Sequence, residues 1–347
     1  MSLQEYTIND QDVDEWLPWG GLVRESVVKN KDDSFFGVIA YVPYPKKDDK
    51  KIKYREYRKG WVIWTEKQHR EGEDRCYLIV CWNPFYRMTH IAENALGAAS
   101  VSESEAALYF EKELSSIAKD LSKVTTCKVL AYQDVIDFLA FSLSLGDEKI
   151  TMPEVPLYLD VLLSQDLQVE FLENGLAINH KQLLVFTPLS IPSMSIMNIL
   201  YQAFEKVPYR YVQRLLLFDQ KSAEADLNKY MDKWCSGRKY VKNALKADLL
   251  SNLNGYYSNN FFFLLDEENY QKVDHYCRNI METLGLSYVV ESYNLKDVWW
   301  GSLAGIFRAN INPLVTGFDC LDDLLVHPTE ENTTSIEIGG TEPNVQT

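Results

Sequence analysis

Three stretches decide the fold class of this 347-residue chain: FFGVIAYV at residues 35–42, WVIWT at 61–65 and CYLIVCW at 76–82. Each is short, rich in β-branched and aromatic residues, and bounded by polar segments, which is typical of β-strands. Strands that follow one another through polar loops favour antiparallel pairing. We therefore predict an antiparallel sheet in the first half of the chain.

A helix that packs on this sheet is predicted to begin after Ser102. The Ser102 hydroxyl can cap the helix, and Glu105 stands where it completes a capping box. The apolar residues of the segment share one helical face: Ala107, Phe110, Leu114, Ile117 and Leu121. A second helix is predicted over residues 134–144 and ends near Gly146.

The segment TMPEVP at residues 151–156 marks the predicted boundary between two subdomains, because its prolines prevent a helix from continuing. After it, strands are predicted at 182–187, 211–218 and 287–291, with helices over 193–205, 227–245 and 266–284. This order suggests a split βαβ, ferredoxin-like arrangement.

The predicted fold class is therefore α+β, with antiparallel or mixed sheets and packed helices. One subdomain covers residues 16–150 and the other 151–327. Residues 1–15 and 328–347 are polar and poor in core-forming residues, so we expect tails at both ends.

The composition excludes some classes of protein. A net charge of −15 and a pI near 4.9 make direct nucleic-acid binding unexpected, since phosphate neutralisation needs a dominant basic face. The six cysteines form no CxxC pair, which favours a reducing, cytoplasmic location. The apolar stretches contain Pro188 and Pro192 or are shorter than the roughly 20 residues that cross a bilayer.

No catalytic, cofactor-binding or metal-binding residue is predicted. The sequence lacks the GxxxxGK[ST] pattern that cradles nucleotide phosphates, and Gly237 begins only a superficial GRK match. HExxH and GxSxG patterns are also missing. His275 and Cys277 are two residues apart in a predicted helix, which places them on roughly opposite faces.

One basic cluster interrupts the acidic sequence between residues 46 and 59. The simpler interpretation is a solvated hairpin loop with no binding role. The functional interpretation is contact with anionic lipid, where each well-placed cation adds on the order of 1 kcal/mol to the binding free energy. The candidate lipid-contact residues are Lys46, Lys47, Lys50, Lys51, Lys53, Arg55, Arg58 and Lys59.

Two tryptophan pairs are candidates for an interaction surface: Trp16 with Trp19, and Trp299 with Trp300. Indole side chains bury a large area and are enriched at interfaces. The alternative is core packing, which we expect for at least one residue of each pair.

Six stretches, in order, carry a family resemblance. They are LPWGGLVRESVVKNKDDSF (17–35), GWVIWTE (60–66), YLIVCWNP (77–84), MPEVPLYLD (152–160), VPYRYVQRLLLFD (207–219) with Lys233 and Trp234 further on, and WGSLAG (300–305) with Asn312, Pro313 and the run at 321–325. Together they resemble the N-terminal, non-motor region of the CagE/TrbE/VirB family of type IV secretion and conjugal transfer ATPases. The first stretch resembles the opening strand pair of that family, joined by a turn at residues 30–33. The family resemblance covers roughly residues 16–327.

The sequence departs from the family pattern in two places. The lysine-rich loop stands where the family has a long helix, and the P-loop motor domain would begin where this chain stops. The resemblance therefore implies no enzymatic activity and no cofactor for this chain, with ATP used only by a separate motor domain.

The resemblance implies a docking and assembly role at the cytoplasmic, inner face of the inner membrane. The expected partners are inner-membrane components of the secretion system, neighbouring subunits, anionic lipid at the periphery and a second copy of the chain. Self-association would use the segment next to the missing motor, which contains Trp299, Trp300, Leu303 and Leu325. Two alternatives remain open: a free-standing regulator or truncated relic of the same family, and an unrecognised hydrolase.

Overall fold

The computed structural model describes residues 6–8, 15–42, 61–70, 73–84, 102–146, 150–153, 158–165, 167–172, 175–179, 181–188, 208–217, 254–265, 274–275, 278–279, 282, 288–292, 294–306 and 314–317. The predicted C-terminal tail, the basic cluster, Leu325 and the helices predicted over 193–205 and 227–245 lie outside these residues. So does most of the helix predicted over 266–284. The N-terminal tail predicted over residues 1–15 is wrong at residues 6–8, which form strand β1 (Tyr6–Ile8) because their backbone pairs with β8 (Val169–Leu172).

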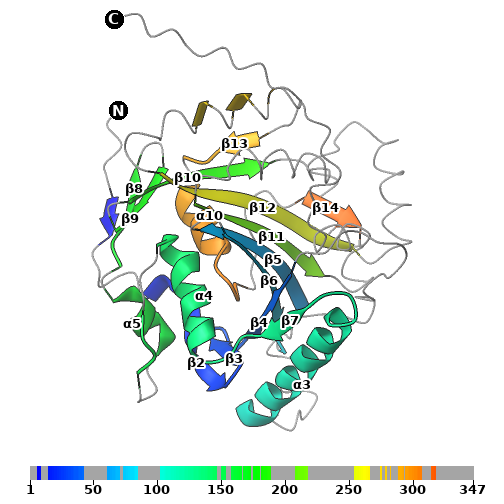
Figure 1. Ribbon diagram of the computed structural model, residues 1–347. Helices are drawn as coiled ribbons and strands as arrows, with labels where there is room; N and C mark the ends of the chain where they lie inside the picture. Colours follow the sequence, from blue (N-terminus) through cyan, green and yellow to red (C-terminus); the bar gives the residue numbers. More distant parts are fainter. Residues whose placement is uncertain are drawn as a thin grey trace, which may run out of the picture.

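A single antiparallel sheet of 14 strands frames the described part of the chain (Figure 1). Its order is β1-β8-β9-β10-β12-β11-β5-β6-β4-β3-β2, with β13 also paired to β10, β14 to β12 and β7 to β4. The α+β class predicted from the sequence is confirmed. The strands are β1 (Tyr6–Ile8), β2 (Trp19–Arg24), β3 (Val27–Asn30), β4 (Phe35–Tyr41), β5 (Trp61–Arg70), β6 (Glu73–Trp82), β7 (Cys127–Val129), β8 (Val169–Leu172), β9 (Gly175–Ile178), β10 (Lys181–Pro188), β11 (Tyr209–Leu217), β12 (Asn254–Leu265), β13 (Tyr288–Val290) and β14 (Leu314–Gly317).

The three deciding stretches form β4, β5 and β6, which are adjacent in the sheet. Strand β5 runs five residues beyond the predicted end at Thr65, through the polar residues 66–70. It continues because ten residues of β5 pair with β6, so the backbone ladder extends where the apolar pattern stops.

The turn predicted at residues 30–33 is present, but it joins β3 to β4. The Asn30 amide donates to the Ser34 carbonyl, and Asp33 has a left-handed backbone with φ of 62°. Asp residues tolerate this conformation better than most. The first quoted stretch therefore contains the hairpin β2–β3, which turns at Glu25 and Ser26, and the start of the next strand.

Four helices cover the described sheet: α3 (Glu103–Leu121), α4 (Gln133–Ser144), α5 (Leu159–Ser164) and α10 (Leu295–Gly301). The capping box predicted for α3 is present, since the Ser102 hydroxyl accepts from the Glu105 amide and the Glu105 carboxylate accepts from the Ser102 amide. The five predicted apolar residues are buried along one face of α3. Helix α4 matches the prediction, and its C-cap Leu145 has φ of 53°.

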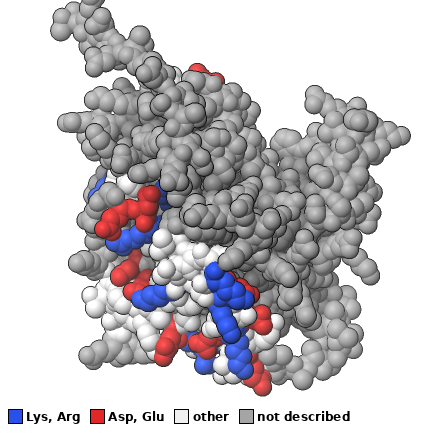
Figure 2. All heavy atoms as spheres, turned by 45° about the vertical axis from the view of Figure 1, so that its right-hand side comes forward, with Lys and Arg blue, Asp and Glu red and all other residues white. Residues whose placement is uncertain are grey.

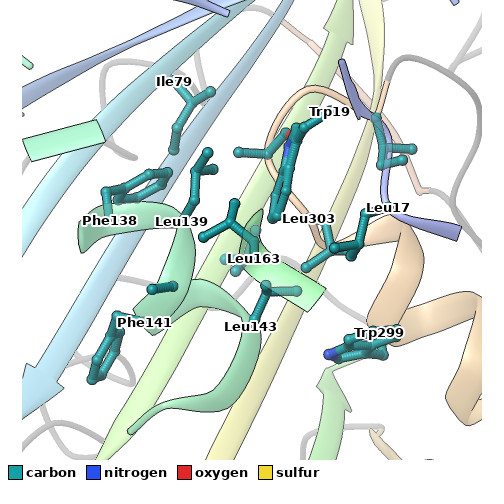
Figure 3. Packing of buried hydrophobic residues seen from close by; sticks show 14 of the residues in the cluster. Leu17, Trp19, Ile79, Phe138, Leu139, Phe141, Leu143, Leu163, Trp299 and Leu303 are labelled. Atoms are coloured by element: carbon teal, nitrogen blue, oxygen red, sulfur yellow. The ribbon is translucent and has the colours of Figure 1, made fainter. Parts of the chain in front are cut away.

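The two faces of the sheet carry separate cores. Alternate residues of β5 divide between them: Trp61 and Ile63 pack under α3, whereas Val62 and Trp64 pack with α4, α5 and α10. This alternation is the two-residue period of a strand buried on both faces. The second and larger core draws on residues from Leu17 to Ile306 (Figure 3).

Strands of the two predicted subdomains meet in the middle of the sheet. Eight residues of β11 pair with β5, from Leu216 with Val62 to Tyr209 with His69. Within the second half the order β13-β10-β12-β11 has only antiparallel pairs. Its connecting helices lie outside the described residues, so the ferredoxin-like arrangement and the subdomain boundaries stay predictions.

Candidate interaction surface

The two tryptophan pairs, which are 280 residues apart in the sequence, are brought together beside α10. Trp19, Trp299 and Leu303 are at most 1% exposed and belong to the core (Figure 3). The Trp19 indole donates a 2.7 Å hydrogen bond to the Ala304 carbonyl. Because their side chains are enclosed, these three residues offer no surface to a partner, which corrects their assignment as interaction residues. One residue of each pair is buried, as expected.

Trp16 and Trp300 remain candidates for contact because both are only partly buried. The Trp300 indole donates a 2.6 Å hydrogen bond to the Trp16 carbonyl. The Lys296 ammonium lies 3.2 Å from the centre of the Trp16 ring, within cation–π distance. These two contacts hold Trp16 against α10.

A buried ion pair joins the two halves of the sheet. Arg210 on β11 and Glu66 on β5 are 2.9 Å apart and their side chains are 0% exposed. Ser142 of α4 and Gln68 donate to the other Glu66 oxygen at 2.8 and 2.6 Å. Arg210 also donates to the Ser302 hydroxyl and carbonyl. Buried charges need such partners, because an uncompensated charge in the interior is very costly.

Sequence reasoning missed this network, since its hydrogen bonds join residues up to 144 positions apart. A signal was available: Glu66 and Arg210 both lie in stretches that carry the family resemblance, and each is a charged residue directly next to a predicted strand. The surrounding elements and the apolar Phe262 ring, 5.4 Å from the Arg210 guanidinium, exclude solvent. The network is therefore enclosed in the interior and has no access to a substrate.

A second polar cluster lies on the opposite face of β5. Lys67 and His69 each contact a different oxygen of Asp74 at 2.7 Å. Partial burial favours the neutral carboxyl, but Lys67 and then His69 outweigh this effect and hold the pKa of Asp74 below its usual value. The His69 ring stacks on Tyr209 at 5.3 Å between ring centres. This cluster again connects β5 to β11.

An open groove of about 410 Å³ lies beside β2. Its apolar lining consists of Leu22, Val23, Ile136, Met152, Pro153, Leu159 and Leu162, and its polar lining of Arg24, Glu25, Glu111 and Tyr132. Two apolar side chains of the adjoining α5 region are exposed, Tyr158 at 73% and Val161 at 46%. Clustered apolar exposure of this kind marks interaction sites.

The walls of the groove are fixed by hydrogen bonds. The side chain of Gln133, at the start of α4, accepts from the Met152 amide and donates to the Ile150 carbonyl. This interaction anchors the proline-containing segment that forms one wall. On the other wall Arg24 and Glu111 form a 2.5 Å ion pair between β2 and α3.

Tyr132 stands at the rim in an unusual conformation. Its φ of 47° is rare for a bulky residue and costs on the order of 1–3 kcal/mol. Its amide donates to the Glu25 carbonyl at 2.9 Å, and the hydrogen bond between its hydroxyl and the Glu25 carboxylate raises the pKa of Tyr132. Strain of this kind persists at sites where the surrounding structure holds it.

The described residues hold no cluster of three or more metal-ligating side chains. None of the helices in that part of the chain is long and apolar enough to cross a membrane. His275 is exposed, whereas Cys277, Gly237, Leu325 and the eight basic residues between 46 and 59 lie outside the description. The groove beside β2 and the Trp16–Trp300 cluster are therefore the candidate contact sites within the described structure.

Comparison with known proteins shows a similarity to a conjugal transfer protein. The chain is 24% identical to the conjugal transfer protein TrbE of Rhizobium radiobacter over 308 aligned residues, which cover 75% of this chain. It spans 37% of the length of that relative. No family model matches the chain. The similarity to TrbE confirms the resemblance to the CagE/TrbE/VirB family that the sequence indicated.

Proposed function

We propose that this chain is a docking and assembly portion of a type IV secretion, or conjugal transfer, machine. It contacts inner-membrane components of the machine and neighbouring subunits. The similarity to TrbE over three quarters of the chain carries this proposal. The groove beside β2 and the half-buried Trp16–Trp300 cluster supply surfaces that suit protein contact.

We also propose that the chain does not hydrolyse ATP by itself. The sequence lacks the GxxxxGK[ST] pattern whose backbone amides and lysine hold the β and γ phosphates. Titration calorimetry with Mg-ATP should give no heat of binding. A micromolar affinity that is lost when residues around Gly237 are changed would contradict this part of the proposal.

Membrane association is proposed to be peripheral and to use the basic cluster between residues 46 and 59. The purified chain should sediment with anionic liposomes at low salt and be released as salt screens the attraction. Changing Lys46, Lys47, Lys50, Lys51 and Lys53 to glutamine should abolish sedimentation. Equal sedimentation of the altered protein would assign this cluster to the solvated surface.

The docking role is tested by purification from cells that carry the cognate transfer genes. The tagged chain should retain inner-membrane transfer proteins after detergent extraction, identified by mass spectrometry. Cells that lack those genes provide the control. Recovery of the same proteins from both strains, or of no transfer protein from either, would contradict a docking role.

A further inference from the structure

The groove beside β2 lies at an open edge of the sheet. In the described structure β2 is the last strand in the order, so one of its edges has no neighbouring strand. Three consecutive residues, from Leu22 to Arg24, line the groove. Since successive side chains of a strand point to opposite faces, a groove that touches all three runs past the strand edge.

The helices around the groove support this position. Glu111 belongs to α3, which covers one face of the sheet, whereas Ile136 of α4 and Leu159 of α5 belong to the core of the other face. Residues from both covering layers meet only at the rim of a sheet. In addition, a Cβ atom placed on Gly21 of β2 would meet no atom within 4 Å, so there is open space over one face of the strand at this residue.

The chemistry of the groove indicates its occupant. Seven apolar lining residues and the exposed Tyr158 and Val161 favour an apolar segment. Two carboxylates, Glu25 and Glu111, line the groove with one cation, Arg24, which is already paired with Glu111. The charged side chains of the lining therefore sum to −1, and the whole chain has a net charge of −15.

Long-range attraction and local pairing both favour a cationic side chain next to Glu25. An open strand edge offers backbone groups to an incoming extended segment, and its side chains then alternate into apolar pockets. On the described part of the face shown in Figure 2, acidic and basic side chains are interspersed.

We propose that this groove binds an extended apolar peptide segment that carries a Lys or Arg, supplied by a protein partner. The segment lies along β2, places apolar side chains against Met152 and Leu162, and pairs its cation with Glu25. This inference rests on the proposed docking function and names the chemistry of the docked partner.

Selection of random 12-residue peptides displayed on phage against the immobilised full chain tests the proposal. Enriched sequences should combine alternating apolar residues with Lys or Arg. A fluorescein-labelled copy of the most enriched peptide should bind in anisotropy titrations, and it should increase hydrogen-exchange protection of residues 20–24. Failure to enrich any sequence, enrichment of acidic peptides, or unchanged protection of β2 would overturn the proposal.

Charge reversal at the rim provides the decisive variant. Glu25→Lys should raise the Kd of the labelled peptide about fivefold or more, because the attraction between Glu25 and the cation of the peptide becomes a repulsion. Glu25 is exposed, and circular dichroism would show that the fold is kept. The matched control is Glu73→Lys, an identical change at an exposed residue at the start of β6, which should bind as the parent does. Equal affinity of the Glu25 and Glu73 variants would overturn the proposal.

Two further results separate this inference from others. If the parent dimerises in sedimentation and Glu25→Lys makes it monomeric, the occupant is a second copy and the proposal is wrong. If peptides do not bind but the chain still retains transfer proteins, docking stands and uses a different surface. If peptides bind but no transfer protein is retained, the groove is a peptide-binding site and the proposed role in a conjugal transfer machine is wrong.

Discussion

At the residue scale, Glu66 and Arg210 form an ion pair whose two side chains are fully enclosed. A buried ion pair is costly to desolvate, so its presence does not by itself imply a gain in stability. Here four further groups hydrogen-bond to the pair: Gln68 and Ser142 donate to Glu66, and the Ser302 hydroxyl and carbonyl accept from Arg210. The network therefore defines how β5, β11, α4 and the end of α10 fit together.

Removal of one member should be far more damaging than removal of both. Arg210→Met leaves the Glu66 carboxylate buried without its counter-charge and should lower the unfolding free energy by about 3–5 kcal/mol. The double change Glu66→Leu with Arg210→Met removes both charges and should recover a large part of that loss. Urea unfolding followed by circular dichroism measures both. A double variant as unstable as the sum of the single changes would contradict this account.

Cysteine reactivity gives a second test at this scale. Burial raises the pKa of Cys76 to about 12, although Lys67 opposes the effect, and burial also raises the pKa of Cys81. Since the thiolate is the reactive form, both should resist iodoacetamide in the native protein at pH 8 and react after unfolding. Mass spectrometry of the labelled peptides reports each site separately. Rapid native labelling of Cys76 would show that β6 opens readily.

At the element scale, α3 is specified by local sequence more than any other described helix. Its start depends on the reciprocal hydrogen bonds of Ser102 and Glu105, and its buried face depends on apolar residues at helical spacing. Neither feature needs a distant partner. For this reason the helix could be predicted from the sequence with its cap.

Loss of the cap should have a measurable but moderate cost. Ser102→Ala removes the side-chain acceptor of the Glu105 amide and should lower the unfolding free energy by about 1 kcal/mol. The matched control is Ser115→Ala in the exposed middle of the same helix, which should be neutral or slightly stabilising because alanine has the higher helix propensity. Thermal unfolding compares the two. Equal effects would show that the cap contributes nothing.

At the scale of the whole molecule, the pairing of β5 with β11 makes the two halves of the chain depend on each other. The larger core contains residues from both halves, including Trp64 and Val212, and the Glu66–Arg210 pair crosses the same junction. A first half on its own would expose the long edge of β5 and bury Glu66 without its partner. Both changes disfavour an independent fold.

A fragment of residues 1–150 should therefore fail to unfold cooperatively. In urea it should show a broad or absent transition and a tendency to aggregate, whereas the full chain should show a sharp one. Circular dichroism and sedimentation velocity measure both properties. A fragment that is monomeric and unfolds cooperatively would instead confirm the predicted subdomain at residues 16–150 as an independent unit.

The sequence by itself determined the elements whose signals are local. The α+β class, the strands around residues 35–42, 61–65 and 76–82, the capped helix after Ser102 and the turn at Asn30 follow from periodicity, capping and turn chemistry. The family resemblance likewise rests on short stretches in order. These features depend on residues that are close in the chain, so they can be recognised without the fold.

Only the tertiary structure decided which elements became neighbours. The pairing of β5 with β11, the ion pair of Glu66 with Arg210, and the burial of Trp19 and Trp299 beside the half-buried Trp16 and Trp300 join residues 140 to 285 positions apart. The groove beside β2 likewise forms from α3, α4, α5 and an open strand edge. Packing energy and charge compensation select such contacts among many that the same local patterns allow, so no local signal identifies them.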